Sequence, residues 1–417
     1  MESTDGKTYG AIVAGAGPAG CSAALFIANA GNAVLLPDKS HFPREKVCGD
    51  AFSGKSIGVM RELALLSEIV KFPHGIVRGV SMFSPNGRSI TVPFPKAEGM
   101  DFAGYTIRRK DVDSILFQAA LAHKNIEVVQ GFQVQGLLKD ESGAVMGVEG
   151  SGADGKKQSF QSRVVIGADG AASAVSRLLK LPPSPVEHVY SAVRGYYSGI
   201  SGLTENIELY FIDGVLPGYL WIFPMGNGIA NVGVGILSSD LQKGRKHPAV
   251  VLKDAIANHP AISSRFKEAK LEGGIAGWSI PNGSFRKQCH GNGWVLVGDA
   301  ASLVDPFSGE GVGNALSSGK FAAMAINRAL SQNPGTMPLS ADSLAGYSKE
   351  VDLKLRPEME NSYKLQRLSR FRFLLNLFIG KAASKPQARQ IIVDMFASDE
   401  GKKKVESPLT YLRLLLP

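Results

Sequence analysis

Several classes of protein are excluded by what this chain of 417 residues lacks. Its three cysteines, Cys21, Cys48 and Cys289, form no C-x-x-C pair, which argues against a disulfide framework and for a reducing compartment. The seven histidines are scattered without metal-ligand spacing, so we predict no metal site. No uninterrupted apolar run approaches the ~20 residues of a membrane-spanning helix. The first residues include Glu2 and Asp5, which a secretory signal would not contain, so we expect a cytoplasmic protein.

The composition is that of a folded protein with a sizeable core. Hydrophobic residues make up 44% and charged residues 20%, so the chain can bury a core that divides into two or three lobes. Its net charge is +9, and residues 351–417 hold 13 Lys and Arg against 7 Asp and Glu. Such a basic region can face nucleic acid, an anionic membrane or only water. We predict no nucleic-acid binding, because the basic residues are interleaved with apolar ones.

A glycine-rich segment near the N-terminus carries the first functional motif. Two short apolar runs flank a small-residue helical pattern, and the turn before the helix holds Gly15, Gly17 and Gly20. Asp38 follows the second run, 23 residues after Gly15. These glycines allow a sharp turn, a close approach to a pyrophosphate and tight helix–strand packing, while Asp38 would bind ribose hydroxyls. The pattern therefore predicts a dinucleotide site, with a purely structural turn as the alternative.

Two later segments place an acidic residue after an apolar strand pattern. Residues 164–167 lead into Asp169 and Gly170, and residues 294–297 lead into Gly298 and Asp299. Carboxyl ends of strands are where open α/β sheets bind ligands, so both carboxylates are candidate ligand contacts. A helix N-cap is the alternative role for Asp299.

Between these segments the chain changes character. From residue 186 to 277, alternating apolar runs predict an antiparallel sheet, interrupted by a helical stretch at 249–268. Residues 77–94 predict a hairpin with its turn at residues 85–87. We expect this region to bind the substrate.

Together the three motifs resemble those of the flavin-dependent oxidoreductases of the para-hydroxybenzoate hydroxylase superfamily, in order and over nearly the whole chain. Two further segments resemble hallmarks of the geranylgeranyl reductase family, which saturates isoprenoid double bonds of lipids and quinones. They are residues 42–50, FPREKVCGD, and residues 217–224, PGYLWIFP. Met225 stands where the family usually has Lys after the Phe-Pro pair.

The resemblance implies an α/β fold. A Rossmann-like FAD-binding domain of the glutathione reductase type would carry an antiparallel-sheet substrate domain and a helical C-terminal region. The expected bounds are 1–75, 103–185 and 278–335 for the FAD-binding domain, 76–102 and 186–277 for the substrate domain, and 336–417 for the helical region.

The resemblance also implies FAD as the cofactor. The first motif would bind its ADP half, Asp169 would brace the pyrophosphate region, and Asp299 would bind the ribityl hydroxyls. N–H groups at the start of the helix after Gly309 would stabilise negative charge at N1 of the reduced flavin. The expected cofactor-binding residues are Gly15, Gly17, Ala19, Gly20, Asp38, Lys39, Arg44, Cys48, Gly49, Arg108, Asp169, Gly170, Gly298, Asp299, Pro306, Gly309, Gly311, Val312 and Gly313.

The implied reaction needs a hydride from flavin N5 to one alkene carbon and a proton to the other. Cys48 is the implied proton donor or site organiser, since a free thiol is mostly protonated at neutral pH. We expect Arg44 and Lys46 to push it toward thiolate, and packing alone is the alternative role. Tyr219 and Trp221 share one face of a strand pattern, where they either line an apolar tunnel for a prenyl chain or fill the core.

The implied partners are a prenylated lipid or quinone and an electron donor, NAD(P)H or a ferredoxin; no second nucleotide fingerprint selects between the donors. One rival function is that of an oxygen-using flavoenzyme, a monooxygenase or halogenase. Halogenases carry G-W-x-W-x-I-P, whereas residues 218–224 lack the first Trp and the Ile. A second rival is an electron carrier without a substrate of its own.

A last pattern lies in the basic C-terminal region. Apolar residues recur there at spacings of three and four, which predicts one continuous helical face. That face either closes the core or rests on the inner face of a membrane. Its members are Leu365, Leu368, Phe371, Leu375 and Phe378.

Overall fold

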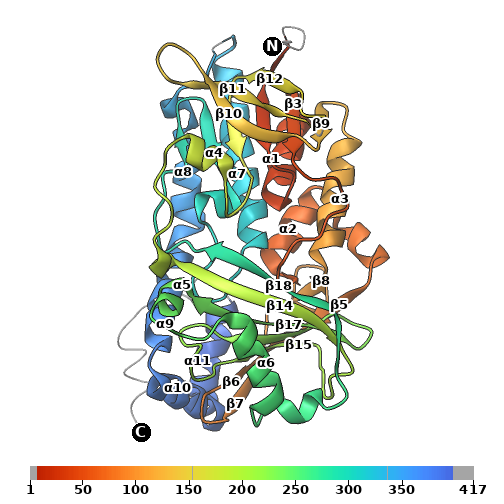
Figure 1. The fold of residues 1–417 in the computed structure, drawn as a ribbon, viewed down its shortest axis with the longest axis vertical. Coiled ribbons are helices and arrows are strands. Elements are labelled where there is room, and N and C mark those ends of the chain that lie inside the picture. Colours follow the sequence, from red (N-terminus) through yellow and green to blue (C-terminus); the bar gives the residue numbers. More distant parts are fainter. Residues whose placement is uncertain (1–6, 153, 336, 398–417) are drawn as a thin grey trace.

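A six-stranded sheet organises the upper half of the molecule in Figure 1. The computed structural model describes residues 7–152, 154–335 and 337–397. Five strands of this sheet are parallel and in the order β20-β13-β2-β3-β9, and β19 joins β20 antiparallel. The strands are β2 (Ala11–Ala14), β3 (Val34–Asp38), β9 (Ile126–Gln130), β13 (Val165–Gly167), β19 (His290–Gly291) and β20 (Trp294–Leu296).

Small residues let two helices pack closely beside this sheet. Ser22 of α1 donates a hydrogen bond to the Leu316 carbonyl of α7 over 2.7 Å. A Cβ on Gly319 would lie only 2.3 Å from the Ala19 carbonyl oxygen, so glycine is required there. The helices of this half are α1 (Pro18–Asn29), α2 (Gly54–Glu62), α3 (Arg109–Leu121), α4 (Ala174–Leu178), α7 (Val312–Gln332) and α8 (Ala341–Lys354), with the 3-10 helix η1 (Leu66–Lys71).

Two smaller sheets flank the six-stranded sheet. One has the order β1-β12-β11-β10 and the other β4-β8-β5. Their strands are β1 (Thr8–Tyr9), β10 (Gln133–Lys139), β11 (Val145–Ser151), β12 (Lys157–Ser162), β4 (Ala51–Phe52), β5 (His74–Val77) and β8 (Gly104–Ile107).

A seven-stranded sheet forms the lower half (Figure 1), in the order β18-β14-β17-β16-β15-β6-β7. Neighbours are antiparallel except β15 and β6, so the expected antiparallel sheet and the 77–94 hairpin are confirmed. The strands are β6 (Gly79–Phe83), β7 (Ser89–Pro93), β14 (Val189–Ser198), β15 (Asn206–Tyr210), β16 (Leu220–Pro224), β17 (Ile229–Leu237) and β18 (Lys270–Pro281).

Helices pack against this sheet through the apolar side chains that alternate along its strands. Val232, Val234 and Ile236 of β17 are fully buried in one apolar cluster with Leu252 of α6. The elements here are α5 (Ser238–Gln242), α6 (Pro248–Asn258), η2 (Val186–His188) and η3 (Ser263–Phe266). The expected helical stretch at 249–268 is therefore a helix followed by a short 3-10 turn.

The C-terminal region is helical, with α9 (Arg356–Ser369), α10 (Arg372–Ser384) and α11 (Pro386–Ala397). The prediction of one continuous helical face is wrong, because Phe371 has an extended backbone that ends α9 before α10 begins. Of that set, Leu375 is buried against β6 and β7, whereas Leu368 and Phe371 are 39% and 53% exposed. Residues 398–417 of this expected region lie outside the described residues. Otherwise the expected fold class is confirmed.

In the described part of the chain, no helix combines the length and the apolar character that crossing a bilayer requires.

Candidate active site

The glycine-rich turn after β2 closes onto the second motif. Gly15 has a φ of +107°, and a Cβ there would lie 2.6 Å from the Ala168 carbonyl oxygen and 3.0 Å from Asp169 Cα. A Cβ on Gly20 would lie 1.8 Å from the Gly15 carbonyl oxygen. Both positions therefore require glycine, and the turn brings the start of α1, with Ala19, next to Asp169.

Asp38 braces this turn from the end of β3. Its Oδ2 accepts a hydrogen bond from the backbone N–H of Ala16 over 2.7 Å, and its Oδ1 accepts one from Ser40 over 2.7 Å. Each carboxylate oxygen keeps a second lone pair, so Asp38 can still accept from a ribose hydroxyl. Lys39, beside it, is exposed.

Asp169 leaves a buried oxygen without a partner. Its Oδ2 accepts from the backbone N–H of Val175 over 3.0 Å, but its Oδ1 is buried without a hydrogen bond. Burial raises the pKa of this carboxyl, while hydrogen bonds from Ser173 and Val175 oppose the rise. The adjacent Gly170 has a φ of +77° and open space where a Cβ would point. Asp169 Oδ1 is therefore free to accept a hydrogen bond from a bound ligand.

The third motif meets both the first motif and the start of α7. Gly298 has a φ of +59°, and a Cβ there would lie 3.1 Å from the Ala19 side chain. Asp299 lies inside the short 3-10 helix η4 (Gly298–Ala301), whose N-cap is Val297, so the N-cap role considered for Asp299 is wrong. A Cβ on Gly311 would lie 3.7 Å from Asp299 Oδ1.

The segment before α7 is tightly built. Pro306 is buried, and its carbonyl accepts from Gln366 of α9 over 3.0 Å. Helix α7 begins at Val312, and a Cβ on Gly313 would lie 2.3 Å from a Glu310 carboxylate oxygen. Gly309 is exposed with a φ of +72°. The segment therefore leaves the backbone at the start of α7 close to Asp299.

Two arginines of the predicted set lie on different elements. Arg44 is 3.4 Å from Asp113 and lies over the Phe42 ring, and a Cβ on Gly17 would lie 3.5 Å from its guanidinium. Arg108, just before α3, lies over the Tyr196 ring at 4.4 Å. The structure thus brings Arg44 to the glycine-rich turn and Arg108 to the seven-stranded sheet.

Lys46 lies between the third motif and the seven-stranded sheet. Its ammonium is 3.3 Å from the centre of the Trp278 ring, and it is buried without a hydrogen-bond partner. Burial lowers its pKa to about 8, while the charge of Asp299 raises it. The pKa of Asp299 is in turn raised by burial and lowered by Lys46 and Arg109.

Cys48 is half-buried in the loop between β3 and β4. Burial raises the pKa of its thiol, Arg109 lowers it and Asp50 raises it, and the net direction is upward. Lys46 interacts electrostatically with Cys48, in the direction we expect, but burial outweighs the nearby cations and the thiol stays on the protonated side. Arg109 is the cation that lowers this pKa most, and two of its three guanidinium nitrogens, Nε and Nη2, donate to Asp113 over 2.7 and 2.9 Å.

The aromatic residues of the PGYLWIFP segment lie against this loop. A Cβ on Gly49 would lie 3.2 Å from the Phe223 ring and 3.8 Å from Trp221 Nε1. The Tyr219 ring packs edge-on against Trp221, with centroids 6.3 Å apart. Tyr219 also donates a hydrogen bond to the Ser308 carbonyl, and a Cβ on Gly309 would lie 3.2 Å from its hydroxyl oxygen. An aromatic row therefore runs from the Cys48 loop to the glycines before α7.

Three polar residues of this site were missed by the sequence interpretation. Asp50 accepts hydrogen bonds from Tyr196 over 2.6 Å and from Asn231 over 2.8 Å, and all three side chains are buried or nearly so. Asp50 stands in the FPREKVCGD segment, and Asn231 is a polar residue in an otherwise apolar strand run, which is a usable signal. We find no comparable signal for Tyr196.

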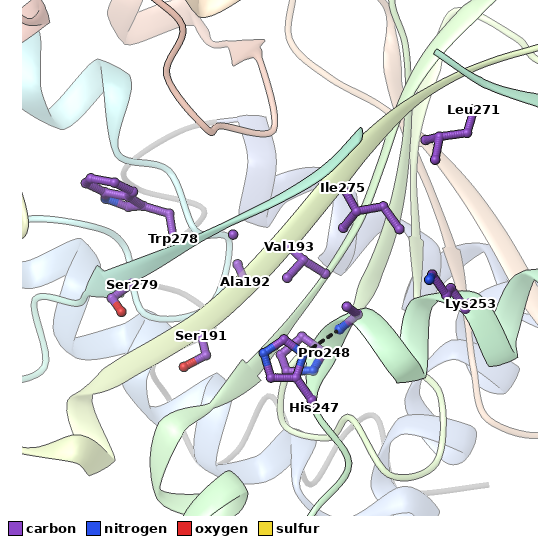
Figure 2. A pocket seen from close by; sticks show the side chains of 12 residues that line it. Ser191, Ala192, Val193, His247, Pro248, Lys253, Leu271, Ile275, Trp278 and Ser279 are labelled. Carbon is purple, nitrogen blue, oxygen red and sulfur yellow. Dashed lines mark hydrogen bonds between the residues drawn. The ribbon is translucent and has the colours of Figure 1, made fainter. Parts of the chain in front are cut away.

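A cavity of about 800 Å³ lies elsewhere, between α6 and the β14–β18 edge of the seven-stranded sheet (Figure 2). Val193 and Ile275 give it an apolar side, and His247 and Lys253 lie on the α6 side. None of the predicted site residues is among those that line it.

Buried polar atoms test whether the converging motifs fit a nucleotide cofactor. Lys46 Nζ, Asp169 Oδ1 and Arg194 Nε are buried without a hydrogen-bond partner, and each belongs to an element described above. Such atoms are costly unless a ligand or water completes them. FAD offers phosphate oxygens for the cations and hydroxyl groups for the carboxylate, so the residues present fit this group.

Comparison with known proteins agrees with this fit. The model of the FAD binding domain family matches residues 8–333. The chain is 35% identical over 327 residues to a menaquinone reductase of Mycobacterium tuberculosis, covering 75% of each chain. It is 33% identical over 329 residues to digeranylgeranylglycerophospholipid reductase 1 of Methanococcoides burtonii, covering 78% of this chain and 76% of the relative.

A solved structure shares the fold over nearly the full length. It is a geranylgeranyl bacteriochlorophyll reductase-like protein of Thermoplasma acidophilum, with a TM-score of 0.82 and 23% identity, covering 96% of this chain and 99% of that one. The expected FAD cofactor is thereby confirmed, and the enzyme class with it. The chain belongs to the geranylgeranyl reductase family of FAD-dependent oxidoreductases.

Proposed function

We propose that this enzyme reduces C=C double bonds in the prenyl chain of a lipid or quinone. The observation that carries the proposal is the contact between the Cys48–Gly49 loop and the aromatic side chains of Trp221 and Phe223. This contact supports a reaction site in which the loop that carries the Cys48 thiol borders an aromatic surface. The two relatives described above, one named for a quinone and one for a prenyl lipid, support the same reaction class.

The proposed substrate surface is apolar because residues of two neighbouring hydrophobic clusters form it. Ile207, Leu209 and Tyr219 pack against both the cluster that contains Trp221 and the cluster under α10. Burying a prenyl chain there would remove apolar surface from water, at about 25 cal/mol for each Å². Tyr219 and Trp221 are proposed to position the double bond, since Trp221 borders the Cys48–Gly49 loop and the Tyr219 ring packs edge-on against Trp221.

When bound and reduced by the electron donor, FAD would supply the hydride that the alkene receives. Cys48 is proposed to supply the matching proton: its S–H bond breaks as a C–H bond forms, and the thiolate left behind takes a proton from solvent. The raised pKa of this thiol favours the protonated, donating form at neutral pH. Arg109 stabilises the transient thiolate, because its charge lowers the same pKa.

Residues of the three motifs are proposed to hold different parts of FAD. The glycine-rich turn and Arg44 are proposed to hold the pyrophosphate, Asp38 the adenosine ribose, and Asp299 the ribityl chain. We propose that the first and third motifs belong to an FAD-binding domain and the seven-stranded sheet to a substrate domain, with the bounds expected from the sequence. NAD(P)H or a ferredoxin is proposed as the source of electrons.

We further propose peripheral contact with the inner face of an anionic membrane through the turn between α9 and α10. Leu368, Phe371 and Phe373 are 39%, 53% and 65% exposed there. Arg367, Arg370 and Arg372 alternate with them along the chain, although Arg370 and Arg372 also form ion pairs with Asp240 and Asp213. Exposed apolar side chains among arginines suit a surface of anionic headgroups. A lipid substrate could then leave the bilayer close to α10, which packs on the substrate sheet.

One assay separates the proposal from its rivals. The FAD-loaded protein, reduced chemically without air, is incubated with menaquinone or a geranylgeranyl lipid, and the product is analysed by mass spectrometry. A reductase adds two hydrogens for each double bond. In a parallel sample opened to air, oxygen consumption with a hydroxylated or halogenated product would identify a monooxygenase or halogenase, and the absence of any product in both samples would identify an electron carrier.

A further inference from the structure

A buried carboxylate next to the candidate proton donor has no role in the reaction described above. Asp50 is 1% exposed and has a φ of +65°. Its Oδ2 accepts hydrogen bonds from the Tyr196 hydroxyl over 2.6 Å and from the Asn231 amide over 2.8 Å. Its Oδ1 accepts from the backbone N–H of Arg109 over 3.2 Å. Three donors from three elements therefore fix one carboxylate.

Asn231 connects this carboxylate to both candidate catalytic residues. The same amide nitrogen also donates to the Cys48 carbonyl over 2.8 Å, while the Asn231 Oδ1 accepts from Trp221 Nε1 over 2.9 Å. Asn231 is 0% exposed, so water does not compete for these bonds. One side chain thus fixes the Cys48 loop against the aromatic row of β16.

Several charged groups face Asp50 and Cys48. Arg109 of α3 and Lys46 of the loop are the cations near the thiol, and Asp50 is the anion near it. Arg194 of β14 faces Asp50 and lies over the Tyr196 ring at 4.3 Å. Burial raises the pKa of Asp50 to about 6, while Tyr196, Asn231 and Arg194 lower it, so the carboxylate is mostly ionised at neutral pH.

We propose that Asp50 is a positioning residue whose negative charge, held in place by Asn231 and Tyr196, keeps the Cys48 thiol protonated opposite Trp221. The inference rests on the proposed function, in which Cys48 donates a proton. Two cations close to a thiol would by themselves favour thiolate, which has no proton to give. The Asp50 carboxylate opposes them from close by, because one nitrogen, Asn231 Nδ2, lies 2.8 Å from both its Oδ2 and the Cys48 carbonyl. Burial of the thiol acts in the same direction, whereas the backbone N–H of Asp50 favours thiolate. A neutral side chain would fill this position without the free-energy penalty of a buried charge, so the charge itself calls for a role.

The test measures the ionisation of Cys48 separately from turnover. The full-length, FAD-loaded protein is treated with iodoacetamide between pH 6 and 10, and alkylation of the Cys48 peptide is followed by mass spectrometry. In Asp50→Asn the alkylation profile is expected to shift to lower pH by about one pH unit, giving about tenfold more thiolate at a given pH below the midpoint. The control is Asp240→Asn, which removes another buried carboxylate, ion-paired with Arg245, and is expected to leave the profile unchanged.

An unchanged profile in Asp50→Asn would overturn the inference. If Asp50→Asn does not fold, Tyr196→Phe, which removes one donor to the same carboxylate, replaces it in the test, and an unchanged profile in that variant would overturn the inference too. Turnover is then compared: kcat for prenyl reduction should fall by more than KM rises, since binding surfaces are intact. If the wild-type protein reduces no prenyl substrate, the proposed function fails, while the alkylation result still decides whether Asp50 controls the thiol.

Discussion

Asp50→Asn is expected to make the protein more stable although it impairs the reaction. Burial raises the pKa of this carboxyl from 3.8 to about 6. A raised carboxyl pKa contributes stability below pH 3.8 that is lost as the pH rises through about 6. At pH 8 the ionised, buried carboxylate therefore costs about 3 kcal/mol, at about 1.4 kcal/mol for each pH unit between the two values. At pH 5 it costs about half as much.

The replacement has its own penalty. Asparagine tolerates the left-handed backbone of residue 50 and can still accept from Tyr196 and Asn231. Its amide nitrogen would however face the backbone N–H of Arg109, where Asp50 Oδ1 now accepts over 3.2 Å, at a cost of about 1–2 kcal/mol. The net gain is about 1–2 kcal/mol at pH 8 and near zero at pH 5.

Scanning calorimetry of the wild-type and Asp50→Asn proteins at pH 5 and pH 8 checks this expectation. The variant should unfold about 1–3 °C higher at pH 8, with little difference at pH 5. Asp240→Asn serves as the control, because it leaves Arg245 and Arg370 without their partner and should lower Tm at both pH values. A variant less stable than wild type at pH 8, or a difference that does not change with pH, would refute the reasoning.

Three further predictions test the cofactor site, the thiol and the membrane contact. Gly20→Ala should abolish FAD binding, because its Cβ would lie 1.8 Å from the Gly15 carbonyl oxygen, whereas Gly58→Ala, in open space, should bind FAD normally by flavin absorbance. Cys48→Ala should keep bound FAD and lose at least tenfold in kcat for prenyl reduction; full turnover would exclude the donor role. Replacing Phe371 and Phe373 by Ser should reduce sedimentation with anionic vesicles severalfold, with Leu353→Ser, exposed on α8, as the control. Equal sedimentation of the two variants would contradict the proposed membrane contact.

The parts of the site that could be predicted from the sequence depend on local geometry. Gly15 lies in a turn with a positive φ, Gly20 lies in α1 where a Cβ would meet the Gly15 carbonyl, and the spacing to Asp38 follows from one strand–turn–helix–strand unit. Asp299 could be predicted because it follows closely after a buried strand, β20. Such features need only a few neighbouring residues, so a single sequence reveals them.

The parts that could not be predicted depend on distant pairings. Tyr196 and Asn231 reach Asp50 across 146 and 181 residues, through the register of β14 and β17. No local sequence pattern indicates that Tyr196 and Asn231 contact Asp50. The C-terminal helix was mispredicted for a related reason, since the apolar period continues across Phe371 although the backbone there is extended. The net upward pKa of Cys48 likewise depends on its burial, which spacing from Arg44 and Lys46 does not reveal.

The most direct test of the central claim is product analysis after a single anaerobic turnover. Chemically reduced, FAD-loaded protein is mixed with menaquinone or a geranylgeranyl lipid in deuterated water, and the lipid is examined by mass spectrometry. We expect saturation of a prenyl double bond with solvent deuterium incorporated on carbon, in an amount that is greatly reduced in Cys48→Ala. A yellow, reducible protein that leaves every prenyl chain unchanged would contradict the claim.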